Sequence, residues 1–297
     1  MMNLAHWRLL VAVADAGTIS GAAQRVGITQ SGASQAIAQL EAALGFAVFN
    51  RERRQVGITA LGEQVIDHAR TMLAGLQAIR TLADDSQGLS GARIRLASFP
   101  SIVSTVLPAL LRDFHRRHPG IEIAVVEGSD EEVERWLESG AVEAGVVMNP
   151  AAERSALTLG SDVWVAVLPQ AHALTRRATE RGIGLHELAA EPFILATGGC
   201  AVNGQRLMEE AGLQLRDVRI TVRDWASACV LVREGMGVSL VPESTLPADR
   251  HGLRVLPITP GIRRVFGLVC SEVGRASRAT QVFVRGLGVA VDPLAPH

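Results

Sequence analysis

The sequence predicts an α/β protein in which a small N-terminal part, built from three helices and a hairpin, is followed by one long helix and a larger part with alternating strands and helices. Three observations lead to this prediction. Residues 18–41 read as two short helices joined by a tight turn, residues 59–83 repeat apolar side chains at steps of three and four, and apolar strands alternate with helices from residue 92 onward. A chain of 297 residues, 48% of them hydrophobic, is long enough for two domains with ample core.

The helix pair at residues 18–41 has one buried and one outward face. We expect Ser20 to cap the first helix and Gly27 to end it, and Thr29 to cap the second. The apolar side of the second helix consists of Ala33, Ile37, Leu40 and Leu44, and its opposite side of Ser31, Gln35, Ala38 and Ala42. Because that outward face is small, polar and uncharged, it suits a DNA major groove. The alternative is an ordinary solvated helix pair in an all-α domain.

A helix and a hairpin flank this pair. Leu4, Trp7, Val11 and Ala14 mark the apolar side of a helix that ends near Gly17, and two short apolar runs, 46–48 and 56–58, enclose an arginine-rich turn. Three helices and a hairpin form a winged helix-turn-helix. We expect the wing arginines to lie along DNA phosphates, although a solvated charged turn is the alternative. These arginines are Arg51, Arg53 and Arg54, and residues 1–57 carry five arginines against three acids, while the whole chain has a net charge of -1.

A long helix is predicted to begin at Thr59. Its apolar residues approximate a heptad repeat: Leu61, Val65, Ala69, Met72, Leu76, Ile79 and Ala83. With no neighbouring element to cover this seam, we expect a dimer formed through the same helix of a second copy. The polar segment 84–91 reads as the linker into the next domain.

The N-terminal ninety residues carry a family resemblance. The segment AVADAGTISGAAQRVGITQSGASQAIAQLEAALGFAVFNR, followed by ITALGE, resembles the DNA-binding domain of LysR-type transcriptional regulators, and the second half resembles that family more loosely. The resemblance implies a double-stranded DNA operator, tetramers built as pairs of dimers, and a two-lobed effector domain like a periplasmic binding protein, crossed by two strands. The domains would be residues 1–58 (DNA-binding), 59–90 (linker and dimer helix) and 91–297 (effector-binding, with lobe I at 91–161 and 268–297 and lobe II at 162–267).

The DNA-reading residues follow from the helix pair and the wing. Our candidates are Thr18, Ser20, Thr29, Gln30, Ser31, Ser34, Gln35, Arg51, Arg53 and Arg54. Family members frequently carry an arginine at the place of Gln35 and a proline at that of Ser31, and this chain has neither. We therefore expect readout that leans towards adenine through Gln35.

The second half is predicted to contain a parallel sheet with helices on both faces. Strands are expected at 92–98, 121–127, 142–148, 164–168, 193–196, 219–222, 238–241 and 265–271, and helices at 101–118, 131–139, 204–211, 226–234 and 276–288. Ligands of such sheets bind at the carboxyl ends of the strands. The candidate effector-binding residues are therefore Ser98, Pro100, Ser101, Ile102, Ser129, Met148, Thr197, Gly198, Cys200, Trp225 and Phe266.

The expected effector is a small carboxylate or another anion. Hydroxyls and backbone amides at Ser101 and Thr197 could hold it, although Ser101 has the alternative role of capping its helix. Trp164 and Phe266 lie near the two crossing strands, where a core or hinge role is the alternative.

Cys200 supports a second hypothesis, a thiol-based redox sensor. It lies near the position at which peroxide-sensing members of the family carry a reactive cysteine. The chain departs from their pattern because Gly199 replaces a histidine and Met208 stands in the following helix, where no second cysteine is found. A reactive thiol also requires a setting that lowers its pKa.

The sequence contains few features that are typical of other classes of function. We find no nucleophile elbow, glycine-rich nucleotide motif or metal-ligand cluster among the eight histidines, so we expect no enzyme, catalytic residue, cofactor or metal. We see no signal peptide and no apolar run of about 18 residues, so we expect a cytoplasmic protein without membrane contact. A solute-binding receptor that does not bind DNA is the remaining alternative.

Overall fold

The computed structural model describes residues 3–50, 56–86, 89, 91–176 and 182–291. The chain forms two compact units, one of Met1–Ala83 with Ser139–Ala141 and one of Asp84–Glu138 with Val142–His297. Within the described ranges, no helix is both long and apolar enough to cross a membrane.

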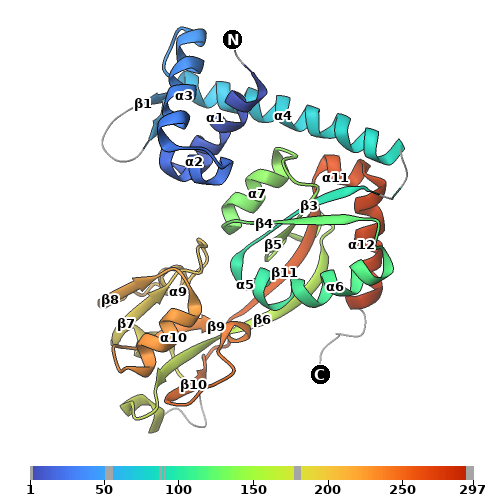
Figure 1. Ribbon diagram of the computed structural model, residues 1–297. Coiled ribbons are helices and arrows are strands. Elements are labelled where there is room, and N and C mark those ends of the chain that lie inside the picture. Colours follow the sequence, from blue (N-terminus) through green and yellow to red (C-terminus); the bar gives the residue numbers. More distant parts are fainter. Residues whose placement is uncertain (1–2, 51–55, 87–88, 90, 177–181, 292–297) are drawn as a thin grey trace. The chain divides into compact units, whose positions relative to one another are not determined.

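The first unit contains the helices and the hairpin that the sequence predicts (Figure 1). Residues of α1, α2, α3 and α4 share one apolar core, to which Leu10, Val13, Ala33 and Leu40 contribute fully buried side chains. Strands β1 and β2 pair in antiparallel fashion. The elements are α1 (Leu4–Ala16), α2 (Ile19–Val26), α3 (Gln30–Leu44), β1 (Phe49–Asn50), β2 (Gly57–Ile58) and α4 (Ala60–Ser86).

The caps of the helix pair correct one prediction and confirm two. Thr18, and not Ser20, caps α2: its backbone is extended and its side-chain oxygen accepts a hydrogen bond from the Gly21 amide at 3.1 Å. Ser20 instead lies inside the first turn of α2. Gly27 ends α2 with a left-handed φ of 76°, and Thr29 caps α3 through the Gly32 amide, both as predicted.

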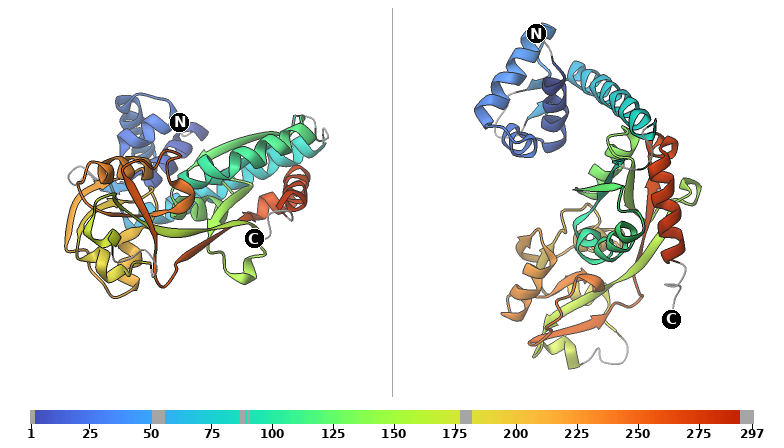
Figure 2. Two further views of the ribbon diagram at one scale, coloured as in Figure 1. Left: turned by 90° about the horizontal axis from the view of Figure 1, so that it is seen from below. Right: turned by 45° about the vertical axis from the view of Figure 1, so that its right-hand side comes forward.

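Helix α1 buries a wider face than expected, since the predicted Trp7, Val11 and Ala14 also pack against the core, and the predicted seam of α4 is partly covered. The most buried residues of α1 are Leu9, Leu10 and Val13, because α1 contacts both α2 and α3 and so buries a wider face than one stripe. The expectation that the whole seam of α4 is uncovered is wrong, since Ala69 of that seam lies in the core of the first unit and Val65 packs against it, next to buried Ile66. The right-hand view of Figure 2 shows α4 as one continuous helix, and it extends to Ser86, into the segment expected to be a linker.

The second unit contains a sheet with the strand order β10-β6-β11-β5-β3-β4, in which β9 also pairs with β6. Strands β3, β4 and β5 are parallel, whereas β11 is antiparallel to both β5 and β6. The bounds are β3 (Arg93–Ser98), β4 (Glu122–Glu127), β5 (Ala144–Met148), β6 (Leu157–Pro169), β9 (Ser239–Pro242), β10 (Leu253–Pro257) and β11 (Arg263–Cys270). A separate parallel pair consists of β7 (Pro192–Ala196) and β8 (Asp217–Val222).

Two large apolar cores divide the second unit into two lobes. In lobe I, helices α5, α6 and α12 cover one face of the sheet, where Phe114 and Phe283 meet edge to face at 4.9 Å, and α7 covers the other face. Lobe II surrounds a core that includes Trp164, Phe193 and Trp225. The helices are α5 (Pro100–Thr105), α6 (Leu107–Arg117), α7 (Asp130–Glu138), α8 (Leu185–Ala189), α9 (Gly204–Glu210), α10 (Trp225–Arg233), α11 (Glu272–Ala276) and α12 (Arg278–Val291).

Strands β6 and β11 run from one lobe into the other, as Figure 1 shows. Residues Leu159 and Phe266 lie in the core of lobe I, whereas Trp164 lies in that of lobe II. The lobes therefore meet where the backbone passes residues 160–163 and 262–265. The two strands therefore form the connection between the lobes at this point.

Several predicted elements differ in their bounds. The helix expected at 101–118 is two helices, because Pro108 lacks an amide hydrogen and its ring disfavours a continuous helix there. Strand β6 begins at Leu157, well before Trp164, and β10, α8 and α11 were not predicted. The remaining predicted strands and helices of this unit are found close to their expected positions.

Candidate functional site

Helix α3 presents an uncharged polar face next to its buried side. Ser31 and Gln35 are exposed, as are Ala38 and Ala42, while Ala33 and Ile37 on the opposite side are buried. The hydroxyls of Thr29 and Ser31 lie 3.2 Å apart in the first turn, where Gln30 is also exposed. Ser34 is half-buried, as is Thr18, and Ser20 is exposed. The exposed side chains can donate to and accept from base edges.

Glu41 fixes the hairpin to the end of α3. Its carboxylate oxygen Oε1 accepts hydrogen bonds from the amides of Val48 at 2.8 Å and Phe49 at 3.0 Å. The wing therefore begins at a defined position relative to the exposed face of α3. The predicted phosphate contacts Arg51, Arg53 and Arg54 lie outside the described residues.

A buried ion pair joins the two crossing strands of the second unit. The strand register places Arg264 of β11 directly opposite Asp162 of β6, and Arg264 Nη2 donates to Asp162 Oδ2 at 2.8 Å. Their side chains are only 2% and 5% exposed. Burial lowers the pKa of Arg264, whereas its hydrogen bond to Asp162 and the charge of that carboxylate oppose the shift. Removing either partner alone would leave the other as an uncompensated buried charge.

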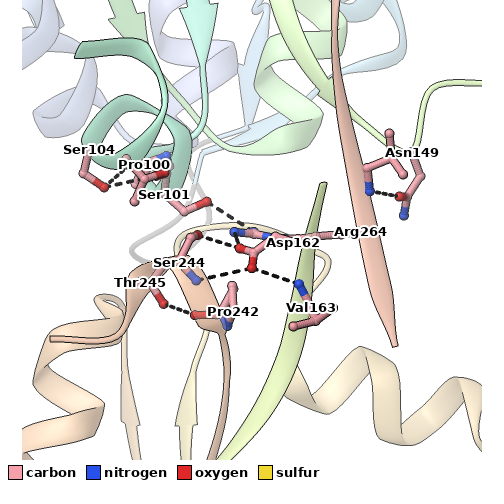
Figure 3. Close-up of polar contacts among 12 residues, drawn as sticks. Pro100, Ser101, Ser104, Asn149, Asp162, Val163, Pro242, Ser244, Thr245 and Arg264 are labelled. Atoms are coloured by element: carbon pink, nitrogen blue, oxygen red, sulfur yellow. Dashed lines mark hydrogen bonds and ion pairs between the residues drawn. The ribbon is translucent and has the colours of Figure 1, made fainter. Parts of the chain in front are cut away.

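Both lobes are hydrogen-bonded to this ion pair (Figure 3). From lobe I, Ser101 of α5 points towards the guanidinium, and Arg264 Nη1 donates to its Oγ at 3.2 Å. From lobe II, the backbone amide and hydroxyl of Ser244 donate to Asp162 at 3.2 and 2.5 Å, and the amide of Val163 donates at 2.8 Å. The crossing point is thus a polar junction between the lobes.

The loop after β7 faces this junction from lobe II. Its Thr197 Oγ1 accepts from the Gly199 amide at 3.2 Å, and Gly198 has a left-handed φ of 62° and packs so closely on Trp225 that a Cβ there would overlap the indole. Trp225 meets Trp164 edge to face at 5.6 Å, and the Arg264 guanidinium lies 5.8 Å from the Trp164 ring centre. An aromatic pair therefore connects this loop to Arg264.

A second contact between the lobes is made by Asp130, the first residue of α7. Its Oδ1 accepts from the Ala201 amide at 2.9 Å and its Oδ2 from the Val202 amide at 3.2 Å. Ser129 and Glu132 cap the start of α7 by reciprocal hydrogen bonds of 3.1 and 2.8 Å, which hold Asp130 in place. A carboxylate of lobe I thus accepts hydrogen bonds from two backbone amides of lobe II.

The Cys200 thiol has an environment that disfavours the thiolate. Burial and the nearby Asp130 charge raise its pKa to about 12, against the smaller opposing effects of Arg264 and Arg223. Its Sγ lies 3.6 Å from the Gly198 carbonyl oxygen. At neutral pH the protonated thiol therefore predominates.

The structure brings some of the predicted effector residues together and separates others. Ser98 ends β3 fully buried and Ser101 bonds Arg264, whereas Ile102 is part of the core of lobe I. Phe266 is also in that core, opposite half-buried Met148 in the strand register. Pro100 begins α5 and is half-buried.

The candidate residues predicted from the sequence leave out four residues at these sites: Glu41, Asp130, Asp162 and Arg264. A usable signal existed for the last two, because each is a charge inside an apolar strand run, at even spacing from an aromatic residue. Asp162 shares a strand face with Trp164, as Arg264 does with Phe266. A charge on the apolar face of a strand indicates a partner, but the sequence does not say which.

In the described part of the chain, no group of three or more His, Cys, Asp or Glu side chains is arranged to hold a metal ion.

The chain matches two family models that together cover most of its length. "Bacterial regulatory helix-turn-helix protein, lysR family" matches residues 4–63, and "LysR substrate binding domain" matches residues 87–289. The chain is 32% identical over 257 residues to a probable hydrogen peroxide-inducible genes activator of Mycobacterium avium, covering 85% of this chain and 82% of the relative. It is 32% identical over 280 residues to the HTH-type transcriptional regulator IlvR of Caulobacter vibrioides, covering 86% and 88%.

Solved structures share the fold. Full-length OxyR from Pseudomonas aeruginosa superposes with a TM-score of 0.57 at 24% identity, covering 97% of this chain and 98% of that one. Full-length CbnR complexed with its target DNA gives a TM-score of 0.57 at 20% identity, covering 96% and 99%. The chain therefore belongs to the LysR family of bacterial transcriptional regulators, which join a DNA-binding helix-turn-helix domain to an effector-binding domain.

Proposed function

We propose that this regulator acts in the cytoplasm and that a small carboxylate or another anion, bound between its lobes, changes how it holds DNA. The lobes would comprise residues 91–161 with 268–297, and residues 162–267. The DNA-binding domain would be 1–58, and the helix at 59–90 would join two copies.

One observation carries the effector part of the proposal: two sets of hydrogen bonds hold the lobes to each other, and both involve charged groups. Ser101 is bonded to Arg264 at the crossing strands, and Asp130 is bonded to Ala201 and Val202. A ligand that replaces either set would favour a different placement of the lobes. Such a ligand shifts the equilibrium only by its difference in affinity for the two placements.

The proposed effector contacts are those at the strand ends. They are Ser98, Pro100, Ser101, Ile102, Ser129, Met148, Thr197, Gly198, Cys200, Trp225 and Phe266. The candidates on the loop after β7 and those near Arg264 are supported because the Trp225–Trp164 ring pair and the Ser101 hydrogen bond connect them to Arg264. Ile102 and Phe266 have the least support, because both are buried in the core of lobe I.

DNA binding is proposed to use the exposed face of α3 for bases and the wing for phosphates. Gln35 would read adenine, with Gln30, Ser31 and Ser34 beside it and Thr18, Ser20 and Thr29 nearer the backbone. Arg51, Arg53 and Arg54 would supply affinity and salt dependence. Exposed apolar side chains on α4, namely Leu61, Met72 and Ile79, support a dimer through that helix, and pairs of dimers would form the tetramer.

We also propose that the protein is neither an enzyme nor a receptor without DNA binding. The family consists of transcriptional regulators, and the helix-turn-helix match covers residues 4–63. The thiol-sensor alternative draws on relatives named as probable peroxide-inducible activators, but the raised pKa of Cys200 gives it no chemical support.

The test is footprinting of upstream genomic DNA with a panel of small carboxylates and their uncharged amides. We expect at least one carboxylate, and not its amide, to change the protected length or affinity. Thr197→Val should weaken that response while leaving DNA binding without ligand unchanged. A footprint that no carboxylate alters, or one altered equally by the amides, would contradict the effector proposal.

A further inference from the structure

Arg264 is a buried cation that keeps an unused hydrogen-bond donor. Its side chain is 2% exposed, and among the described residues its Nε has no hydrogen-bond partner. Buried polar groups are normally paired, so an unpaired guanidinium donor requires an explanation other than stability. A ligand that is bound at another stage of function would provide one.

Its partner Asp162 cannot take this donor, because its oxygens are already occupied. Oδ1 accepts from the amides of Val163 and Ser244, and Oδ2 accepts from the Ser244 hydroxyl and from Arg264 Nη2. These four bonds match the capacity of a carboxylate. Apart from Asp162, only the Ser101 hydroxyl accepts from Arg264 in the described part, at 3.2 Å. The cluster therefore has more donors than acceptors.

One other unpaired buried group is connected to Arg264 through an aromatic pair, and a second lies three residues before Ser101 in the chain. Trp225 Nε1 has no partner in the described chain, and its indole packs on Trp164, the ring next to the Arg264 guanidinium. Among the described residues, Ser98 Oγ also has no hydrogen-bond partner, and it lies three residues before Ser101, at the end of β3. An indole N–H and a guanidinium N–H can only donate. What this junction lacks is an acceptor, and a carboxylate or similar oxyanion supplies several.

We infer that Arg264 is the residue that recognises the effector's anionic group, with Trp225 Nε1 and Ser98 Oγ as further polar contacts. The inference rests on the proposed function and deepens it. Ser101 then has a second role: in the structure described here its hydroxyl accepts the bond that the ligand's oxygen would accept. Since Arg264 is almost fully covered, the anion reaches it only after α5 separates from the crossing strands. Binding of the anion at Arg264 would therefore require a movement of lobe I.

Asp162 sets the strength of this recognition. Its negative charge lies 2.8 Å from Arg264 and opposes the approach of an anion. Neutralising Asp162 while keeping its shape should increase the affinity for carboxylates. Neutralising both residues should weaken it. This opposite pair of effects is not expected if the ion pair is only structural.

The experiment measures binding of a panel of small monocarboxylates, the matched primary amides and inorganic sulfate and phosphate to the full-length protein by calorimetry. We expect at least one carboxylate to bind and its amide not to bind. Asp162→Asn should tighten the carboxylate by about tenfold, as expected for removal of a buried opposing charge. Arg264→Gln combined with Asp162→Asn should weaken it by about tenfold or more. The double variant leaves no buried charge unpaired, so it is a safer test than Arg264→Gln alone.

Arg263→Gln is the matched control, because Arg263 is the next residue of the same strand but is exposed and donates to Ser161. It should leave the carboxylate affinity unchanged. The inference is overturned if the double variant keeps the affinity, if amides bind as well as carboxylates, if sulfate or phosphate alone binds, or if no carboxylate in the panel binds. A gel-shift assay separates this result from the proposed function. If the native protein does not bind DNA in that assay, the proposed function itself is contradicted, whatever the variants bind.

Discussion

Replacing Asp130 with asparagine is expected to loosen the contact between the lobes without unfolding either. Asp130 accepts amide hydrogen bonds from Ala201 at 2.9 Å and Val202 at 3.2 Å. Asparagine has one side-chain oxygen and no charge, so it can replace at most one of these bonds, and only as a neutral acceptor. The amides of Ala201 and Val202 should therefore exchange with solvent more readily.

The size of this effect follows from the two hydrogen bonds. Each bond to a charged acceptor contributes about 1.5–3 kcal/mol when buried, and a neutral bond about 0.5–1.5 kcal/mol. Asp130 is half-buried and Ala201 is exposed, so the lower ends of these ranges apply. Two charged bonds at the lower end, together about 3 kcal/mol, are replaced by at most one neutral bond of about 0.5 kcal/mol, so the variant should lose about 2.5 kcal/mol from this contact, roughly a seventyfold change in an equilibrium constant.

Native-state hydrogen exchange read out by NMR tests this value at the two amides. Glu131→Gln is the control, since it removes a charge from the same first turn of α7, and the exposed Glu131 side chain forms no hydrogen bond with residues 201–202 among those described. Unchanged exchange of Ala201 and Val202 in Asp130→Asn would refute the reasoning, as would an equal acceleration in Glu131→Gln.

Three other predictions concern the DNA-binding core, the oligomer and the thiol. Ile37→Ala removes a buried side chain of α3 and should lower the free energy of unfolding of the first unit by about 2–5 kcal/mol in denaturant. Gln35→Ala, at an exposed position of the same helix, should change operator preference and alter that free energy by less than about 0.5 kcal/mol, so equal stabilities of the two variants would contradict the burial of Ile37. Ile79→Glu places a charge at an apolar position of α4 that is 65% exposed and should shift sedimentation towards the monomer. An unchanged oligomer would mean that α4 is not the interface. Because burial raises the pKa of Cys200 to about 12, its alkylation by iodoacetamide should increase about tenfold per pH unit between about pH 7 and 9, while a plateau in that range would revive the thiol sensor.

The N-terminal unit could be predicted closely because its signals are local. Gly27 and Thr29 act within one turn of their own position, and the spacing of Ala33, Ile37 and Leu40 is a property of one helix. The one wrong cap was that of α2, where Ser20 was predicted and Thr18 is found. The two residues are two positions apart and both carry a hydroxyl. Burial of Ile66 and Ala69 was harder to foresee, because it depends on how α4 packs on other helices.

The effector-binding unit could be predicted in outline but not at its site. Asp162 and Arg264 are 102 residues apart, and only the pairing of β6 with β11 makes them neighbours. Asp130 likewise meets Ala201 across 71 residues. Spacing within one helix or strand carries no information about such contacts. The sequence does place a charge within each apolar run, which is where a search for hidden partners can begin.

The central claim, that this LysR-family chain binds DNA through α3 and its wing, is tested most directly by the salt dependence of its affinity for upstream genomic DNA. We expect the logarithm of the binding constant to fall linearly with the logarithm of salt concentration, because basic residues displace counterions from phosphates. Gln35→Ala should alter which operator bases are preferred while keeping that slope. Absence of binding at low salt by an intact oligomer, or binding with no salt dependence, would contradict the account.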